Sequence, residues 1–219
     1  YLVHDADNIF DTNYLSKMND AFVAMGKKNT ITSFGNSKNF GSNIISALYG
    51  LFWLNYCRFE NRGRTVLNCS TRVAGTGFLF SKEAVRNGWN YLTLTEDWEF
   101  TADQIIGQNK IYYCDEAVFY DEQPTTLRVM WRQRVRWCRG RWLVCLARLK
   151  DLLKSLFTPK RRNGNKNKFS VYDMTVKVLP VFIITTLLFF ARIVAVFLAP
   201  ALFPNEFTFN GVLLEWLAT

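Results

Sequence analysis

Residues 1–34 read YLVHDADNIFDTNYLSKMNDAFVAMGKKNTITSF, and this stretch decides the fold. Tyr1–His4 is mostly apolar and predicts a short buried strand. A helix follows, with Asp11 as the expected N-cap and Gly26 at its end. The apolar face expected for this helix comprises Leu15, Met18, Phe22 and Met25. Thr30–Phe34 predicts a second strand, so the stretch forms a βαβ unit and indicates an α/β fold with a parallel sheet.

Asp5-Ala6-Asp7 follows the first predicted strand directly. In open α/β sheets the ligand binds beyond the carboxyl ends of the strands, which is where these carboxylates fall. Two carboxylates at this spacing can hold a hard divalent cation such as Mg²⁺ against a diphosphate. An Asx turn leaving the strand explains the same residues, so this motif alone leaves both a metal site and a structural turn open.

The rest of the chain alternates between further predicted strands and helices. The strongly apolar segment Ile44–Cys57 is too short to span a bilayer and predicts a helix that is buried or lies on a membrane surface. The other predicted strands are Val66–Cys69, Lys110–Cys114 and Ala117–Tyr120. The other predicted helices cover Ser81–Asn87, run from Thr95 toward Gly107, and begin at Thr125 or Thr126.

Two short motifs lie between these elements. Gly75-Thr76-Gly77 carries two glycines, which either bring the backbone close to a ligand or form an ordinary tight turn. Thr95-Glu96-Asp97 places carboxylates at a helix start, where they serve as a cap or as a general base. The helix N-terminus lowers the pKa of Asp97 whereas burial raises it, and the sequence does not decide which effect is larger.

Gln133-Arg134-Val135-Arg136-Trp137 has the spacing that brings Gln133, Arg136 and Trp137 to one helix face. An arginine grips phosphate oxygens in a bidentate fork, and an indole stacks on a sugar ring. The face therefore suits a planar or anionic ligand. The alternative is a basic helix that packs its tryptophan into the core.

The formal net charge of +9 is concentrated near the end of the chain. Lys150–Lys168 holds seven basic residues and one acidic residue, Asp151. A basic run beside an apolar run is typical of the cytoplasmic flank of a membrane segment, and no nucleic-acid-binding motif is present. The five cysteines form no C-x-x-C pair, and His4 is the one histidine, so the sequence does not predict a zinc site.

The carboxyl-terminal third predicts association with a membrane. Residues 142–169 are expected to form an amphipathic interface helix, with Leu146, Leu149, Leu153 and Leu156 on one side, and a basic linker. The alternative is a helix packed on the domain. Within residues 170–219, a transmembrane span is expected at about 179–198, with Arg192 facing protein or an aqueous path, and a second span near Asn210. The chain begins and ends within apolar stretches, which suggests a fragment of a longer protein.

Taken in order, the four motifs resemble those of the membrane-embedded, inverting family 2 glycosyltransferases, which include cellulose, chitin, hyaluronan and poly-N-acetylglucosamine synthases. The resemblance implies that residues 1–141 are a partial GT-A catalytic domain, lacking the nucleotide-binding strand and aspartate that precede Asp5 in the family. By this resemblance Asp5 and Asp7 match the D-x-D element that holds Mg²⁺ or Mn²⁺. Asp97 matches the general base, with Glu96 supporting it.

The same resemblance assigns the remaining site residues. Gln133 and Arg136 would lie near the donor diphosphate, Trp137 under the acceptor sugar, and Gly75, Thr76 and Gly77 along the pocket. The resemblance implies a nucleotide-sugar donor, which it indicates to be UDP-linked. It also implies a glycan or lipid acceptor, membrane lipids and other subunits of a synthase complex as partners. Processive polysaccharide synthesis at the cytoplasmic membrane face is the leading hypothesis. Single-sugar transfer to a lipid and a non-catalytic, membrane-anchored basic module that binds lipid or a partner are the alternatives.

Overall fold

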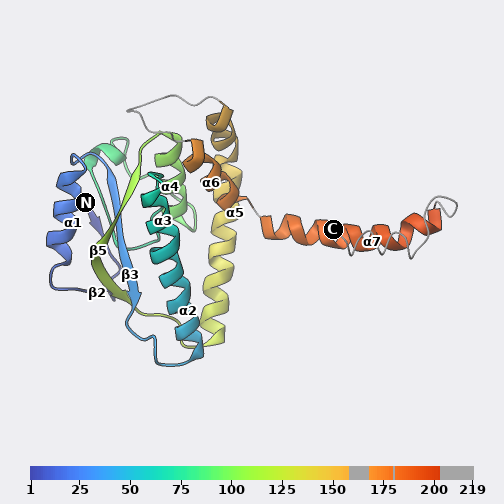
Figure 1. The fold of residues 1–219 in the computed structure, drawn as a ribbon, viewed down its shortest axis with the longest axis horizontal. Helices are drawn as coiled ribbons and strands as arrows, with labels where there is room; N and C mark the ends of the chain where they lie inside the picture. The colour runs from blue at the N-terminus through green and yellow to red at the C-terminus, as the bar shows by residue number, and fades with distance from the viewer. Residues whose placement is uncertain (158–167, 180, 203–219) are drawn as a thin grey trace. The chain divides into compact units, whose positions relative to one another are not determined.

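The computed structural model describes residues 1–157, 168–179 and 181–202 (Figure 1). The chain divides into two compact units, Tyr1–Leu179 and Pro180–Thr219. The elements of the first unit are β1 (Leu2–Val3), β2 (Ile9–Phe10), α1 (Tyr14–Ala24), β3 (Thr30–Ser37), α2 (Ile44–Leu54), the π-helix η1 (Asn55–Asn61), α3 (Arg62–Val66), β4 (Phe78–Phe80), the 3₁₀ helix η2 (Lys82–Val85), α4 (Glu96–Ile106), β5 (Ile111–Asp121), α5 (Leu127–Phe157) and α6 (Lys168–Val178). The described part of the second unit is α7 (Val181–Leu202).

The sheet is mixed, with the strand order β1-β4-β3-β5-β2. β3 and β5 are parallel, whereas β1 and β3 each pair with β4 in antiparallel fashion. β1 and β3 therefore run in the same direction, as the βαβ prediction requires, but they are not neighbours. The prediction of a parallel sheet was only partly right, because the chain returns through the turn at Gly75–Gly77 and inserts β4 between the two strands.

Helices cover both faces of this sheet (Figure 1). α1 packs on one face, where Tyr14 and Met18 meet Ile31 and Phe119. The other face is covered by α2 and η1. Their side chains join those of β3 and β5 in a cluster of Phe34, Tyr56, Cys57 and Tyr113. The two clusters lie on opposite faces because side chains alternate along β3 and β5.

α4, α5 and α6 form a further apolar cluster beside the sheet, which contains Val144, Leu152 and Met174. α5 is one continuous helix of 31 residues, so the predicted boundary between residues 141 and 142 falls inside it. The expected apolar stripe was partly wrong: Leu149 and Leu156 pack against the cluster, whereas Leu146 and Leu153 are exposed. The second half of α5 thus packs on the domain, as the alternative prediction had it.

Three local predictions were also wrong. Val66–Cys69 is not a strand, because the helical backbone of η1 continues through α3 to Val66. The two strands predicted over Lys110–Tyr120 are one strand, β5, whose register against β3 shifts between Ser33 and Phe34. Helix α1 starts after Asn13 rather than Asp11, because Tyr14 takes the buried position while Leu15 points outward and is 62% exposed.

The predicted membrane segments have different outcomes. Among the described residues, none of the helices is long and apolar enough to cross a membrane, so the span predicted at about 179–198 is not supported. The described helix in that region, α7, covers 22 residues. The basic linker at 158–167 and the second span predicted near Asn210 lie outside the described residues.

Candidate functional site

A cavity of about 360 Å³ opens in the first unit. Most residues predicted for the site line it, although they come from four separate segments: Asp5, Gly75, Thr76, Glu96, Asp97, Gln133, Arg136 and Trp137. Asp7 and Gly77 are not part of the lining. The loop after β1, the turn before β4, the first turn of α4 and one face of α5 therefore converge on a single space.

Acidic side chains gather at the end of the cavity formed by the loop after β1. Burial raises the pKa of Asp5, and the charge of Asp7 raises it further, while Arg136 opposes the shift. The pKa of Asp121, the last residue of β5, is likewise raised by burial and then by Asp7. The like charges of Asp5, Asp7 and Asp121 therefore act on one another. No group of three or more His, Cys, Asp or Glu side chains in the described residues is arranged to hold a metal ion.

Hydrogen bonds fix this acidic end to the turn before β4. The backbone N–H of Asp5 donates to the Thr76 hydroxyl at 3.0 Å, and that hydroxyl contacts the side chain of Asn8. Asn8 donates to Asp121 at 3.0 Å. Asp5 is thus placed by residues from three parts of the sequence, and Thr76 joins two of the predicted motifs.

The two glycines of that turn, Gly75 and Gly77, have different surroundings. Both have a left-handed backbone, with φ of +71° at Gly75 and +69° at Gly77. At Gly77 a Cβ would lie 2.2 Å from the Phe119 ring, whereas at Gly75 it would meet no atom within 4 Å. Close packing explains Gly77, so the tight-turn interpretation holds there. Gly75 faces the cavity.

Asp97 lies in the first turn of α4, where two opposite effects act on its carboxyl group. Burial raises its pKa to about 6, the neighbouring charge of Glu96 acts in the same direction, and hydrogen bonds from backbone N–H groups oppose them. Burial therefore has the larger effect. A carboxylate with this pKa is ionised for the most part at pH 7 and is still basic enough to accept a proton from a hydroxyl group.

The three residues predicted to share a face of α5 all reach the cavity. The side-chain oxygen of Gln133 is buried and has no hydrogen-bond partner among the described residues, so it is available to a ligand. Trp137 packs beside Tyr49, Phe52 and Trp53, with ring centres 6.2–6.5 Å apart. Trp137 is thus both part of an aromatic cluster and part of the cavity wall. The cluster agrees with the structural interpretation, and the ligand-binding role stays a prediction.

One glycine sets the distance between α5 and α4. A Cβ at Gly140 would lie 2.4 Å from the hydroxyl and methyl groups of Thr95, which precedes the first turn of α4. Arg148 then connects the same two helices through ion pairs of 3.2 Å with Glu99 and Asp103. The helix carrying Gln133–Trp137 is therefore held directly against the turn carrying Glu96 and Asp97.

Several lining residues were not predicted from the sequence. They are Glu60, Arg72, Asp121, Gln123, Arg141 and Lys177, together with Phe52 and Trp53. The rule that ligands bind at the carboxyl ends of strands could have identified Asp121, since β5 runs parallel to β3 and ends there. Arg72 lies three residues before Gly75, and no sequence pattern marks it.

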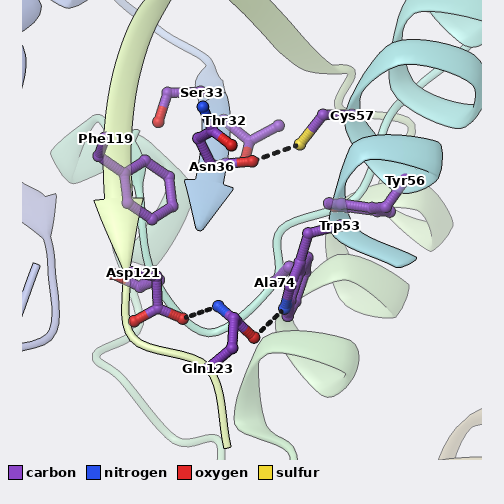
Figure 2. A pocket seen from close by; sticks show the side chains of 12 residues that line it. Thr32, Ser33, Asn36, Trp53, Tyr56, Cys57, Ala74, Phe119, Asp121 and Gln123 are labelled. Carbon is purple, nitrogen blue, oxygen red and sulfur yellow. Dashed lines mark hydrogen bonds between the residues drawn. The ribbon is translucent and has the colours of Figure 1, made fainter. Parts of the chain in front are cut away.

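A second cavity of about 20 Å³ lies between β3, β5 and α2 and shares Asp121 and Gln123 with the larger one. Figure 2 shows the side chain of Gln123 between its neighbours. It donates to Asp121 at 3.1 Å and accepts from the Trp53 indole at 2.9 Å. Gln123 therefore holds Asp121 at the end of β5 and joins it to α2.

Residues 2–209 match the protein family described as glycosyl transferase family group 2. The chain is 25% identical over 182 residues to a poly-β-1,6-N-acetyl-D-glucosamine synthase of Staphylococcus aureus (strain COL). The aligned region covers 82% of the chain and 42% of that protein. It is 32% identical over 84 residues to the probable glycosyltransferase YdaM of Bacillus subtilis (strain 168), covering 37% of the chain and 20% of YdaM. A probable glycosyltransferase of Sulfolobus acidocaldarius is 32% identical over 95 residues, covering 42% of the chain and 20% of the relative. The chain spans less than half the length of each of these relatives.

Proposed function

Since the chain belongs to glycosyl transferase family group 2 and is a glycosyltransferase, we propose that it moves a sugar from a nucleoside diphosphate donor to an acceptor hydroxyl with inversion. The observation that carries the proposal is the convergence of Asp5, Asp97 and Arg136 on one cavity. The mixed sheet with helices on both faces supports assignment to the GT-A fold. Membership of the family favours an enzyme over the non-catalytic membrane module.

Inverting transfer is a single displacement, and the cavity offers a group for each side of it. The acceptor oxygen forms a bond to the anomeric carbon as the bond from that carbon to the diphosphate breaks. Asp97 takes the proton of the acceptor hydroxyl. Arg136 and the side-chain amide of Gln133 would contact the departing diphosphate, since Arg136 is close enough to Asp5 to lower its pKa. Trp137 offers an aromatic face to the acceptor sugar.

The acidic end of the cavity suits a divalent cation. Asp5 and Asp7 would hold Mg²⁺ or Mn²⁺, because carboxylate oxygens are the ligands these ions prefer and the like charges raise the pKa of Asp5. When bound, such an ion neutralises charge on the donor diphosphate.

The acceptor is proposed to be a growing glycan. The Staphylococcus aureus relative is named as a polymer synthase and aligns with 82% of the chain, which supports polymer synthesis from a UDP-linked sugar such as UDP-N-acetylglucosamine. Transfer of a single sugar to a lipid acceptor remains the second candidate, since the same base and diphosphate groups would serve it. Analysis of the product length separates the two.

We further propose that the enzyme works at the cytoplasmic face of a membrane. Exposed apolar side chains on α2 and α5 support this, including Ile44 (75% exposed) and Trp131 (68%). Basic residues lie among them on α5, such as Arg128 and Arg132, and suit anionic lipid headgroups. Flotation of the protein with phosphatidylserine vesicles tests this proposal, and equal recovery with and without vesicles would contradict it.

The function is tested by incubating the intact protein with a panel of UDP-sugars, with Mg²⁺ or Mn²⁺ and with a chelator. Asp97→Asn is expected to lower turnover by at least about 100-fold, as expected for loss of a general base. Arg136→Ala is expected to lower it by at least about tenfold. Arg58→Met serves as the control, because Arg58 pairs with Asp115 outside the cavity. Turnover of Asp97→Asn within twofold of wild type would refute the assigned base.

A further inference from the structure

Arg72 occupies a position that neither the motifs nor the family match assigns. Its guanidinium carbon lies 4.1 Å from the centre of the Tyr56 ring and 4.7 Å from that of Trp98. Arg72, Asp97 and Trp98 line the same cavity. A guanidinium group held by two aromatic rings keeps its charge and loses little rotational freedom on binding.

The backbone around Arg72 is fixed from three directions. The N–H of Thr71 donates to the carbonyl of Ile111 in β5 at 2.9 Å. The Tyr56 hydroxyl donates to the carbonyl of Arg72 itself at 2.6 Å. The N–H of Val73 donates to the Thr101 hydroxyl in α4 at 3.3 Å. The side chain therefore starts from a backbone position set by β5, η1 and α4.

Two arginines in this unit, Arg64 and Arg148, are neutralised by carboxylates, whereas Arg134, which is half-buried like Arg72, stacks on aromatic rings. Arg64 pairs with Asp173 at 2.9 Å, and Arg148 pairs with Glu99 at 3.2 Å. Arg72 forms no ion pair with any residue that the structure describes, and its Nε is buried without a hydrogen-bond partner there. The charge of Arg72 acts on the carboxylates of Glu60 and Asp97 without forming an ion pair with either of them, so a structural ion pair does not account for Arg72.

We propose that Arg72 is a positioning residue for the acceptor side of the reaction. Held by the rings of Tyr56 and Trp98, it lines the same cavity as Asp97 and keeps that carboxylate ionised and directed at the acceptor hydroxyl. This inference rests on the proposed function insofar as Asp97 is the base. It differs from the role of Arg136, whose charge acts on Asp5 at the acidic end of the cavity.

The charges around Asp97 give the sign of the effect. Glu96 on its own helix raises the pKa of Asp97, and Arg72 lowers it. The other charged side chains on the elements that line this cavity are Glu60 of η1, Arg136 and Arg141 of α5 and Lys177 of α6. Lys177 already pairs with Glu60 at 2.9 Å. Removing the Arg72 charge should therefore raise the pKa of Asp97 and extend its protonated range to higher pH.

The direct test is a titration of the intact protein labelled with ¹³C-aspartate and followed by NMR. The Asp97 carboxyl signal is identified by its absence in Asp97→Asn, and its midpoint in the wild type is expected at about 6. In Arg72→Met the midpoint should rise by about 0.5–1 unit. In Arg72→Lys, which keeps the charge, it should stay close to the wild-type value. Arg72→Gln repeats the comparison if Arg72→Met does not fold.

A midpoint that is unchanged in a folded, uncharged Arg72 variant overturns the proposal, and so does a shift in Arg72→Lys as large as that in Arg72→Met.

The rate of sugar transfer supplies a second readout. At pH 6 the uncharged variants should lose about two- to fivefold more turnover than at pH 8, because a smaller fraction of Asp97 is ionised. Arg58→Met, whose guanidinium also stacks on a ring, Phe34, should shift neither value. If wild-type protein transfers no sugar while the titration behaves as expected, the proposed function fails and the electrostatic role of Arg72 stands.

Discussion

Gly140→Ala is the most informative single substitution in α5, because it tests whether the contact between two helices sets the geometry of the site. The added Cβ would lie 2.4 Å from both Cγ2 and Oγ1 of Thr95 and 2.8 Å from its Cβ. Ordinary contacts begin near 3.4 Å, so α5 and the start of α4 must separate by about 1 Å. Thr95 is 4% exposed, which leaves its side chain little room to turn away.

The expected effect on stability is smaller than the effect on catalysis. Overpacking costs about 1–3 kcal/mol, and replacing a glycine by alanine inside a helix returns about 1 kcal/mol. The net loss of about 0–2 kcal/mol corresponds to a fall in Tm of at most about 8 °C for a domain of this size. A displacement of about 1 Å between Asp97 and the groups on α5 should lower turnover by about 100-fold.

Turnover and thermal unfolding are measured on Gly140→Ala, on the double variant with Thr95→Ala, and on Gly63→Ala as the control. Gly63 lies inside α3, and a Cβ there would meet no atom within 4 Å, so this variant should keep full turnover and gain about 0.4–1 kcal/mol. Thr95→Ala removes the two closest atoms and should restore part of the lost turnover. Turnover of Gly140→Ala within threefold of wild type, or no recovery in the double variant, would refute the argument.

Two further predictions concern charged groups near the site. Because burial raises the pKa of Asp97 to about 6, the folded state loses stability as pH rises through that value. Asp97→Asn should therefore be more stable than wild type by about 1–2 kcal/mol at pH 7.5 in urea unfolding, and the difference should vanish toward pH 4. Equal urea midpoints at pH 7.5 would show that burial of the Asp97 carboxylate does not destabilise the folded state. Arg148→Met leaves the buried carboxylate of Glu99 without its ion pair and should lower stability by about 2–3 kcal/mol. Lys17→Met, which breaks an exposed pair, is the control and should not move the urea midpoint, so equal effects of the two variants would contradict this account.

Local patterns predicted those elements of the fold that local forces determine. Thr30–Phe34 lies within β3, and α4 begins at Glu96 as its cap sequence indicated. The position of β4 between β1 and β3 could not be predicted, because the pairing of Leu79 with Leu2 and Ile31 joins residues far apart in the sequence. Val66–Cys69 has strand-like composition, but the helical backbone of η1 and α3 continues to Val66.

The site shows the same division. Asp5, Asp97 and Arg136 belong to short sequence motifs from which their chemistry can be predicted. The structure brings all three residues to one cavity. Arg72 belongs to no pattern, and its position depends on the rings of Tyr56 and Trp98, which arrive from η1 and α4. A residue whose role depends on such an enclosure becomes visible only when the packing is known.

The continuous helix α5 connects the cavity to α6. Its first half supplies Gln133, Arg136 and Trp137 to the cavity, and its second half packs against α6 through Val144 and Leu152. α6 in turn places Lys177 on the cavity wall, and it is joined to η1 by the pair of Lys177 with Glu60 and to α3 by the pair of Asp173 with Arg64. One helix therefore both lines the cavity and packs against α6.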